Sequence, residues 1–516
     1  MTIVQTTNGN VRGSTDGALF SFKGIPYAEP IAGRARWLPP QPRRPWSGVL
    51  DAQNYGLACP QFSTDQSVLF PKARRQYLSA LRGPNALPQG DDSLLLNVWS
   101  PSLDQNAQLP VMVFIHGGGF ASGAANEIYD ASPFAKKGVV AVVIQYRLGP
   151  PGFLHAQGLF DGEFCTNNRA FLDQICALKW VQENIARFGG DPSLVTIFGE
   201  SAGAFSVFPL MASPLAKGLF RRAIPMGGMA QTCAPAKEYQ AMSKDVLQDM
   251  GIAPGDEAAL TALDHSKQMK LLAAVGKRVF GTRKPDQYGS LSREKVGFVG
   301  AATGTDFLPA APLASYAAGT ANDVDLMLGT CADDGQLFSL YLPLPQALSA
   351  RLFMNQLRAL MPKSDIAAAI KYYRAQMRGR SYADVFKQLN NDAFYRMPTI
   401  AAAEAHASAH PGRTYLYELD YQSAINGLGA IHGIDVVLLF GDCYSNALLH
   451  RDAETEALRD QMRQAWTSFA KTGKPSATGM PEWKPYDTNE RAVMSFNRKS
   501  KLMSKRDENL RKFWAK

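Results

Sequence analysis

The chain has 516 residues, of which 46% are hydrophobic and 19% charged, so it can bury a large core. Its formal charge of +9 comes from 54 basic and 45 acidic residues, a mild excess without a long basic run or an aromatic-basic RNA motif. We therefore expect a solvated surface and no nucleic-acid partner. No apolar run approaches the roughly 20 residues needed to cross a bilayer, so we expect no membrane span.

Targeting and metal-binding signals are also missing from the sequence. The opening residues, MTIVQTTNGNVRG, contain no basic segment followed by an apolar one, so no secretory signal is predicted. The six cysteines lie far apart, and their spacing is not typical of a zinc site. We expect no metal, no cofactor, free thiols in a reducing compartment, and a cytoplasmic location.

The first half of the chain alternates apolar, β-branched runs with stretches of helical period. The clearest predicted strands are VMVFIH (111–116), VVAVVIQY (139–146) and LVTIF (194–198). Between the last two, apolar residues recur at helical spacing from Phe171 to Phe188. This order of strand, helix and strand is typical of a largely parallel sheet covered by helices.

The pattern is looser beyond Ile224. Helical insertions are predicted at 237–275 and 348–387, with a polar loop near 281–295 between them. Strands return at VDLMLG (324–329) and TYLYEL (414–419), and a final amphipathic helix passes through Met462, Trp466 and Phe469 before KTGKP ends it. We expect one domain over residues 1–516, with helical cap insertions at about 235–300 and 336–410.

A serine nucleophile is predicted in the segment LVTIFGESAGAFSVFPL. Its G-E-S-A-G (199–203) directly follows an apolar β-run and directly precedes a helix-compatible run. On such a turn, small residues two positions before and after Ser201 let the backbone bend sharply and expose the hydroxyl. An ordinary glycine-rich turn is the alternative, which this context disfavours. The adjoining helix N-terminus favours negative charge, so the N–H of Ala202 is an oxyanion donor candidate.

Consecutive glycines follow the strand VMVFIH, in HGGGFASG (116–123). Their backbone can turn N–H groups toward a bound oxygen, and Gly118 and Gly119 are the best donor candidates. A phosphate-binding loop is the alternative, but neither G-x-x-x-x-G-K-[ST] nor the Rossmann spacing G-x-G-x-x-G is present. His116 ends the strand, so we expect it to brace this loop rather than to act as a base.

A serine hydroxyl is a weak nucleophile, so the chemistry requires a histidine base and an acid that orients it. Where the serine stands on such a strand-to-helix turn, the acid and then the base follow it along the chain. Four of the five later histidines lie in polar or alanine-rich helical surroundings: His265, His406, His410 and His450. His432 lies in GLGAIHGIDVVLLFG, flanked by glycine and apolar residues, and is the predicted base.

The acid should leave the end of a strand between Ser201 and His432. The strand at 324–329 is followed by Asp333 and Asp334. Either carboxylate could hold the imidazole while the other is solvated, so the residue chemistry alone leaves both open.

Long segments of the chain are shared with a known family. They are FKGIPYAEP, DDSLLLNVWSP, VMVFIHGGGFASG, QYRLGPPGFL, NNRAFLDQICALKWVQENIARFGGDPSLVTIFGESAG and GAIHGID. These segments resemble the type-B carboxylesterase family, which includes cholinesterases and bacterial para-nitrobenzyl esterases. The resemblance covers nearly the whole chain and implies an α/β-hydrolase fold, with a large, mostly parallel central sheet and helices on both faces. It also implies hydrolysis of small-molecule carboxylic esters through an acyl-enzyme, and we expect a monomer or homodimer.

The resemblance assigns roles to individual residues. It makes Ser201 the nucleophile and His432 the base, and its D-E-G pattern selects Asp334 over Asp333 as the acid. The oxyanion hole would consist of three backbone N–H groups, those of Gly118, Gly119 and Ala202. Since Asp334 is one methylene shorter than the family's usual glutamate, its loop should lie closer to His432.

Three positions depart from the family pattern or need a new partner. Gly227 stands where the family has a serine that supports the triad, and we expect a water to substitute. Ser93 replaces a cysteine, so Cys59 lacks its usual disulfide partner and packing should hold that loop. Asp92 remains where the family pairs an acid with an upstream arginine, for which there are two candidates, Arg36 and Arg44.

Two other functions stay open at this level. An amidase or carbamate hydrolase would use the same machinery, and no motif separates it from an esterase. A non-catalytic esterase-like binding module is disfavoured, because such modules usually lose the nucleophile or the base, whereas both are present here.

Overall fold

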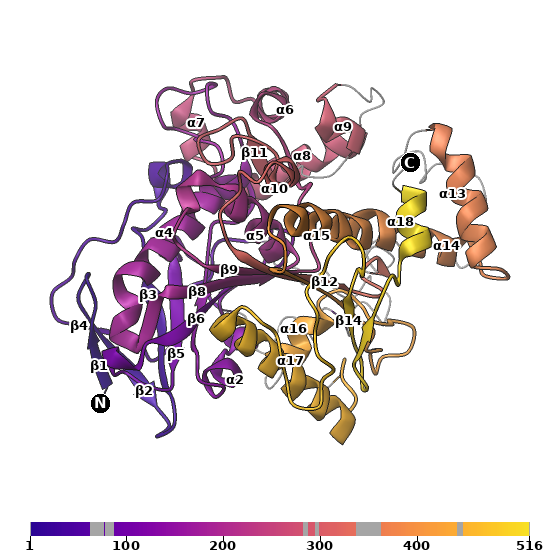
Figure 1. Cartoon of the computed structure of the whole chain (residues 1–516). Coiled ribbons are helices and arrows are strands. Elements are labelled where there is room, and N and C mark those ends of the chain that lie inside the picture. Colours follow the sequence, from indigo (N-terminus) through magenta and orange to yellow (C-terminus); the bar gives the residue numbers. More distant parts are fainter. Residues whose placement is uncertain are drawn as a thin grey trace.

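A 13-stranded mixed sheet forms the centre of the molecule (Figure 1). The computed structural model describes residues 2–61, 77, 87–281, 287–294, 299–336, 363–440 and 447–514. The strands are β1 (Thr2–Gln5), β2 (Asn10–Thr15), β3 (Phe20–Pro26), β4 (Val49–Asp51), β5 (Leu95–Ser100), β6 (Leu109–Ile115), β7 (Val140–Ile144), β8 (Gly190–Glu200), β9 (Arg222–Met226), β12 (Asp325–Cys331), β13 (Thr414–Leu419), β14 (Val493–Phe496) and β15 (Lys501–Met503).

The strand order is β1-β2-β3-β5-β7-β6-β8-β9-β12-β13-β14-β15, and β4 pairs with β2. From β7 to β14 every neighbouring pair is parallel. Strands β1, β2, β3 and β5 extend one edge in antiparallel fashion, and β15 extends the other. The largely parallel sheet predicted from the apolar runs is therefore confirmed, whereas the antiparallel N-terminal strands were not predicted.

Helices cover both faces of the sheet, which explains why its central strands are apolar without alternation. Along β6, Val111, Val113 and Ile115 belong to one apolar cluster, and Met112 and Phe114 belong to the other. The first cluster includes α3 (Gly149–Phe153), α4 (Arg169–Asn184), α5 (Ala202–Ala212), α10 (Pro312–Ala317) and α15 (Met397–Ala409). The second includes α2 (Ser132–Ala135), α16 (Ile434–Leu439) and α17 (Ala453–Thr472), and Figure 1 shows α16 and α17 on the side opposite α15.

Further helices form two groups outside these layers. One group shares a small apolar core and contains α6 (Ala236–Asp249), α7 (Glu257–Thr261), α8 (His265–Gly281) and α9 (Ser290–Glu294), beside a short parallel pair of strands, β10 (Cys233–Pro235) and β11 (Ala301–Thr303). The other contains α13 (Lys363–Gln376) and α14 (Tyr382–Asn391), packed against the C-terminal helix α18 (Glu508–Trp514). The first part of the insertion predicted at 348–387 lies outside the described residues, and a cap function for either group stays a prediction.

Between α14 and α15 the chain forms one π-helical turn, η7 (Asp392–Arg396). No helix among the described residues combines the length and the apolar character that crossing a membrane requires.

Candidate active site

The predicted site residues lie at the carboxyl ends of parallel strands that are close neighbours in the sheet. Ser201 follows β8, Asp334 follows β12 and His432 follows β13, while the glycine loop follows β6. In open α/β sheets ligands bind at this edge, because all parallel strands point to it. The sheet order thus gathers segments that are far apart in the sequence.

Ser201 occupies a strained turn between β8 and α5. Its backbone has φ 58° and ψ −121°, a combination that non-glycine residues rarely adopt. The turn packs so tightly that a Cβ on Gly203 would lie 1.9 Å from the carbonyl oxygen of Ile115. A Cβ on Gly199 would lie 2.6 Å from the carbonyl carbon of Gly203. The two flanking glycines are therefore required by the packing of the turn, as the G-x-S-x-G pattern predicts.

The imidazole of His432 is held by Asp334. His432 Nδ1 donates to Asp334 Oδ1 over 2.8 Å, and both side chains are buried. The other carboxylate oxygen of Asp334 accepts a hydrogen bond from the N–H of Cys331 at 2.8 Å. This arrangement orients the ring so that Nε2 is the nitrogen left for chemistry.

Asp333 is bonded to the loop that precedes His432. Its carboxylate accepts a hydrogen bond from the N–H of Ala430 at 2.8 Å, and its own N–H donates to the carbonyl of Ala430 at 3.0 Å. It therefore fastens the loop that carries His432, and Asp334 alone of the two contacts the ring. The structure distinguishes two carboxylates that the residue chemistry left equivalent.

Glu200 is a member of the site that the sequence reasoning did not identify. Its Oε1 lies 3.1 Å from His432 Nε2, and Glu200 is buried. Neither atom makes a hydrogen bond with any residue that the structure describes, so Nε2 can still accept a proton from a nearby hydroxyl. The only sequence signal was the position of Glu200 directly before the serine.

These carboxylates change the protonation of the site. Burial disfavours the imidazolium of His432, but attraction to Glu200 and the hydrogen bond to Asp334 outweigh it and raise the pKa of His432 to about 9. Burial in turn raises the pKa of Glu200, and the neighbouring His432 offsets part of that rise. Asp435 adds a third buried carboxylate, whose pKa burial also raises. Because these buried groups interact, the protonation of one changes the pKa of the others.

The glycine loop reaches the serine. A Cβ on Gly117 would lie 3.1 Å from the Cβ of Ser201. Gly118 and Gly119 have φ of 114° and 62°, and in the described part of the chain their N–H groups have no backbone acceptor. Ala202 is the first residue of α5, so its N–H has no partner within the helix. All three groups are thus available to an anionic oxygen.

His116 braces this loop, as expected. Its Nδ1 donates to the carbonyl of Gly117 at 2.9 Å, and its ring stacks on Tyr146 at 4.5 Å. Tyr146 in turn donates its hydroxyl to the carbonyl of His116 at 2.8 Å. Burial lowers the pKa of His116 to about 4, which keeps the ring neutral.

Gly227 lies directly behind the pair of His432 and Asp334. A Cβ at this position would lie 3.4 Å from His432 Nδ1 and 3.5 Å from Asp334 Oδ1. The position at which the family has a supporting serine is therefore adjacent to the pair, and the water expected in its place stays a prediction. On another side of the imidazole, the ring of Tyr395 lies 5.2 Å away.

Two further expectations concern the segment before β5. Ser93 Oγ lies 3.1 Å from Cys59 Sγ, so the serine occupies the place of a disulfide partner, and burial raises the pKa of the thiol to about 12. Asp92 pairs with Arg43 at 3.1 Å, so the prediction of Arg36 or Arg44 is wrong. An antiparallel bridge between Ala28 and Pro42 places Arg44 beside Glu29, and these two residues form an ion pair. Arg36 pairs with Asp91 instead.

A serine on a strained strand-to-helix turn, followed by an Asp–His pair from later strands of one parallel sheet, defines the serine hydrolases of the α/β-hydrolase fold. Comparison with known proteins narrows this class. A model of the carboxylesterase family matches residues 1–514. The chain is 34% identical over 515 residues to the para-nitrobenzyl esterase of Bacillus subtilis, covering 95% of this chain and 94% of that protein.

Two more similar proteins are also carboxylesterases. The chain is 34% identical over 520 residues to a liver carboxylesterase of Sus scrofa, with 95% and 88% of the two chains covered. The crystal structure of a carboxylesterase from Geobacillus stearothermophilus has a TM-score of 0.83 at 30% identity and covers 100% of both chains. The chain belongs to the carboxylesterase family, and it is a serine hydrolase of carboxylic esters.

Proposed function

We propose that Ser201 is the nucleophile, His432 the general base and Asp334 the acid that orients it. The N–H groups of Gly118, Gly119 and Ala202 form the oxyanion hole. One observation carries this assignment. The buried 2.8 Å contact of Asp334 with His432 Nδ1 directs Nε2 toward the turn that bears Ser201, where Glu200 is already 3.1 Å away.

The reaction proceeds in two halves. Ser201 Oγ attacks the ester carbonyl while its proton passes to His432 Nε2, and the three N–H groups stabilise the negative oxygen of the tetrahedral intermediate. The alcohol leaves with the proton from His432, so an acyl-enzyme remains on Ser201. Water then loses a proton to the same imidazole and attacks the acyl carbon. The imidazolium returns this proton to Ser201 Oγ as the carboxylic acid leaves.

The first experiment is the Ser201→Ala variant, assayed with para-nitrophenyl esters. We expect its turnover to fall to the background rate with an unchanged circular dichroism spectrum. In the parent, mass spectrometry should locate a fluorophosphonate label on the peptide containing Ser201. Near-parental turnover of the variant, or labelling of a different serine, would refute the assignment.

An amidase or carbamate hydrolase with the same triad is the second candidate function. Amides have a poorer leaving group, so the discrimination between an ester and its matched amide separates the two. We propose that the ester is the better substrate, and an amide turned over with a kcat/KM equal to that of its matched ester would reverse this choice. The proposal also includes action as a monomer or homodimer, which light scattering of the purified chain tests.

A further inference from the structure

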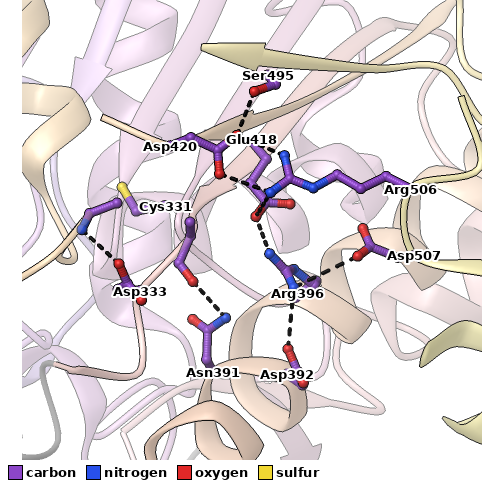
Figure 2. A network of polar contacts seen from close by, with 12 residues as sticks. Cys331, Asp333, Asn391, Asp392, Arg396, Glu418, Asp420, Ser495, Arg506 and Asp507 are labelled. Atoms are coloured by element: carbon purple, nitrogen blue, oxygen red, sulfur yellow. Dashed lines mark hydrogen bonds and ion pairs between the residues drawn. The ribbon is translucent and has the colours of Figure 1, made fainter. Parts of the chain in front are cut away.

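Asn391 brackets the turn that carries Asp334. It is the last residue of α14 and is only 2% exposed. Its Nδ2 donates to the carbonyl of Ala332 at 3.0 Å, and its Oδ1 accepts the N–H of Gly335 at 3.0 Å. Figure 2 shows the first of these bonds beside Asp333. One amide side chain therefore holds both ends of the turn.

The turn packs closely against the backbone of α14. A Cβ on Gly335 would lie 2.5 Å from the backbone nitrogen of Asn391, so glycine is needed there for α14 to approach. On its outer side the turn borders a cavity of about 370 Å³, whose lining includes Asp333, Asn391 and the loop at Gly427. Within the described structure the turn has no packed neighbour on the cavity side, so its position depends on hydrogen bonds, those of Asp333 with Ala430 and those of Asn391 with Ala332 and Gly335.

Asn391 is itself anchored through the turn that follows it. In η7, Asp392 is buried and accepts the hydroxyl of Tyr373 at 2.7 Å, and Tyr373 accepts the indole N–H of Trp514 at 3.0 Å. At the other end of η7, Arg396 is ion-paired with Glu418 at the end of β13. It also lies 3.7 Å from both Asp392 and Asp507 (Figure 2).

The C-terminal segment completes this network. Arg506 pairs with Glu418 at 3.1 Å and with Asp420 at 2.7 Å, and Ser495 donates to Asp420 at 2.5 Å (Figure 2). Glu418 is 3% exposed and depends on two arginines for its charge. Removing one partner from such a buried group destabilises its surroundings. The network therefore joins the chain end, the sheet and η7 into one support.

We propose that Asn391 is a positioning residue for Asp334, kept in place by the ion-pair network of Arg396, Glu418 and Arg506. This inference rests on the proposed function, because it assumes that Asp334 orients His432. Without Asn391 the turn relaxes, the contact between Asp334 and His432 loosens, and the base is misaligned with Ser201.

The decisive comparison is between Asn391→Ala and Asn390→Ala. Asn390 is a buried neighbour, and among the described residues its Nδ2 donates within its own helix, to the carbonyl of Phe386 at 2.7 Å. We expect Asn391→Ala to lower kcat roughly 10- to 100-fold with little change in KM, because misplaced catalytic groups affect the chemical step. Asn390→Ala should keep kcat within about twofold even if its Tm falls equally.

The pH profile provides a readout that a loss of stability alone would not move. A weaker bond to Asp334 stabilises the imidazolium less, so Asn391→Ala should shift the kcat/KM profile to lower pH. Asn391→Asp keeps the acceptor for Gly335 but loses the donor to Ala332, so it should restore part of the activity. If Asn391→Ala does not fold, Asn391→Asp must still show the kcat loss with unchanged KM.

The network is tested with two arginines of the C-terminal stretch. Arg506→Gln breaks the pairs with Glu418 and Asp420, whereas Arg498→Gln breaks surface pairs with Asp452 and Glu454. We expect a lower kcat only for Arg506→Gln, and no further loss when it is combined with Asn391→Ala.

Equal kcat values for Asn391→Ala and Asn390→Ala, or for the two arginine variants, would overturn this inference. If Asp334→Asn is then inactive, the proposed function stands and only the role of Asn391 is lost. A parental rate for Asp334→Asn would remove the proposed function itself.

Discussion

Glu200 and His432 form a buried contact in which Oε1 lies 3.1 Å from Nε2. The imidazole thus has a carboxylate at each nitrogen, since Asp334 accepts from Nδ1. Two carboxylates favour the imidazolium, which in the proposed mechanism is the form of the base after it has taken the proton of Ser201. The two carboxylates also favour the imidazolium before the reaction, when a general base must be neutral. The activity should therefore depend on pH.

This pH sensitivity yields the first prediction. The pKa of His432 is raised to about 9, so kcat/KM should increase with pH through the neutral and mildly alkaline range as the imidazolium loses its proton. Glu200→Gln removes an attraction that raises this pKa. The profile should therefore shift to lower pH, measured as kcat/KM for a para-nitrophenyl ester. An unchanged profile, or a shift to higher pH, would contradict the electrostatic role of Glu200.

The second prediction ranks the two neighbouring aspartates. Asp334→Asn should reduce kcat by roughly 10³- to 10⁴-fold, because the imidazole loses its correct orientation and tautomer. Asp333→Asn keeps an oxygen that can accept the N–H of Ala430, so its kcat should fall by less than roughly tenfold. Both variants are compared with one ester at saturating concentration. The opposite ranking would reassign the acid.

The third prediction concerns Gly227, whose φ is 59°. Gly227→Ala should lower the free energy of unfolding by about 1–2 kcal/mol through backbone strain. Its kcat should stay close to the parental value, because the added Cβ would lie 3.4 Å from the imidazole, which is an ordinary van der Waals contact. Gly412→Ala is the control, since Gly412 has φ 78° and nothing within 4 Å of the added Cβ. A kcat far below that of Gly412→Ala would contradict this and show that the added methyl group displaces the ring.

The fourth prediction uses the buried pair of Cys59 and Ser93. Because the sulfur and the hydroxyl oxygen are 3.1 Å apart, Ser93→Cys should form a disulfide under oxidising conditions. Cross-linking a loop of this kind typically stabilises a protein by about 2–4 kcal/mol. The measurement is the Tm with and without reductant, with thiol titration to count the lost thiols. Ser93→Ala serves as the control, and two free thiols at positions 59 and 93 after oxidation would exclude the bond.

Much of the fold could be predicted because its signals are local. Strands β6, β7 and β8 are continuous apolar runs, since burial on both faces removes any polar alternation. Strands β1 and β2 at the N-terminal edge were missed, because they are short and more exposed. The insertion predicted at 237–275 corresponds to α6, α7 and α8. Apolar residues recur there at helical spacing because they pack into a small core of their own.

The amino-acid sequence by itself determined the strand-to-helix turn at Ser201, because the strand, the glycines and the helix that shape it are adjacent in the chain. It also identified His432 and the glycine loop. The residue chemistry left Asp333 and Asp334 equivalent until the family resemblance favoured Asp334, and the tertiary structure shows that Asp334 contacts the ring. Only the tertiary structure brought Glu200 to His432 and paired Asp92 with Arg43. The physical reason is that neighbouring side chains point in different directions. Whether Asp333 or Asp334 reaches His432, which is 98 residues from Asp334, depends on the path of the folded backbone.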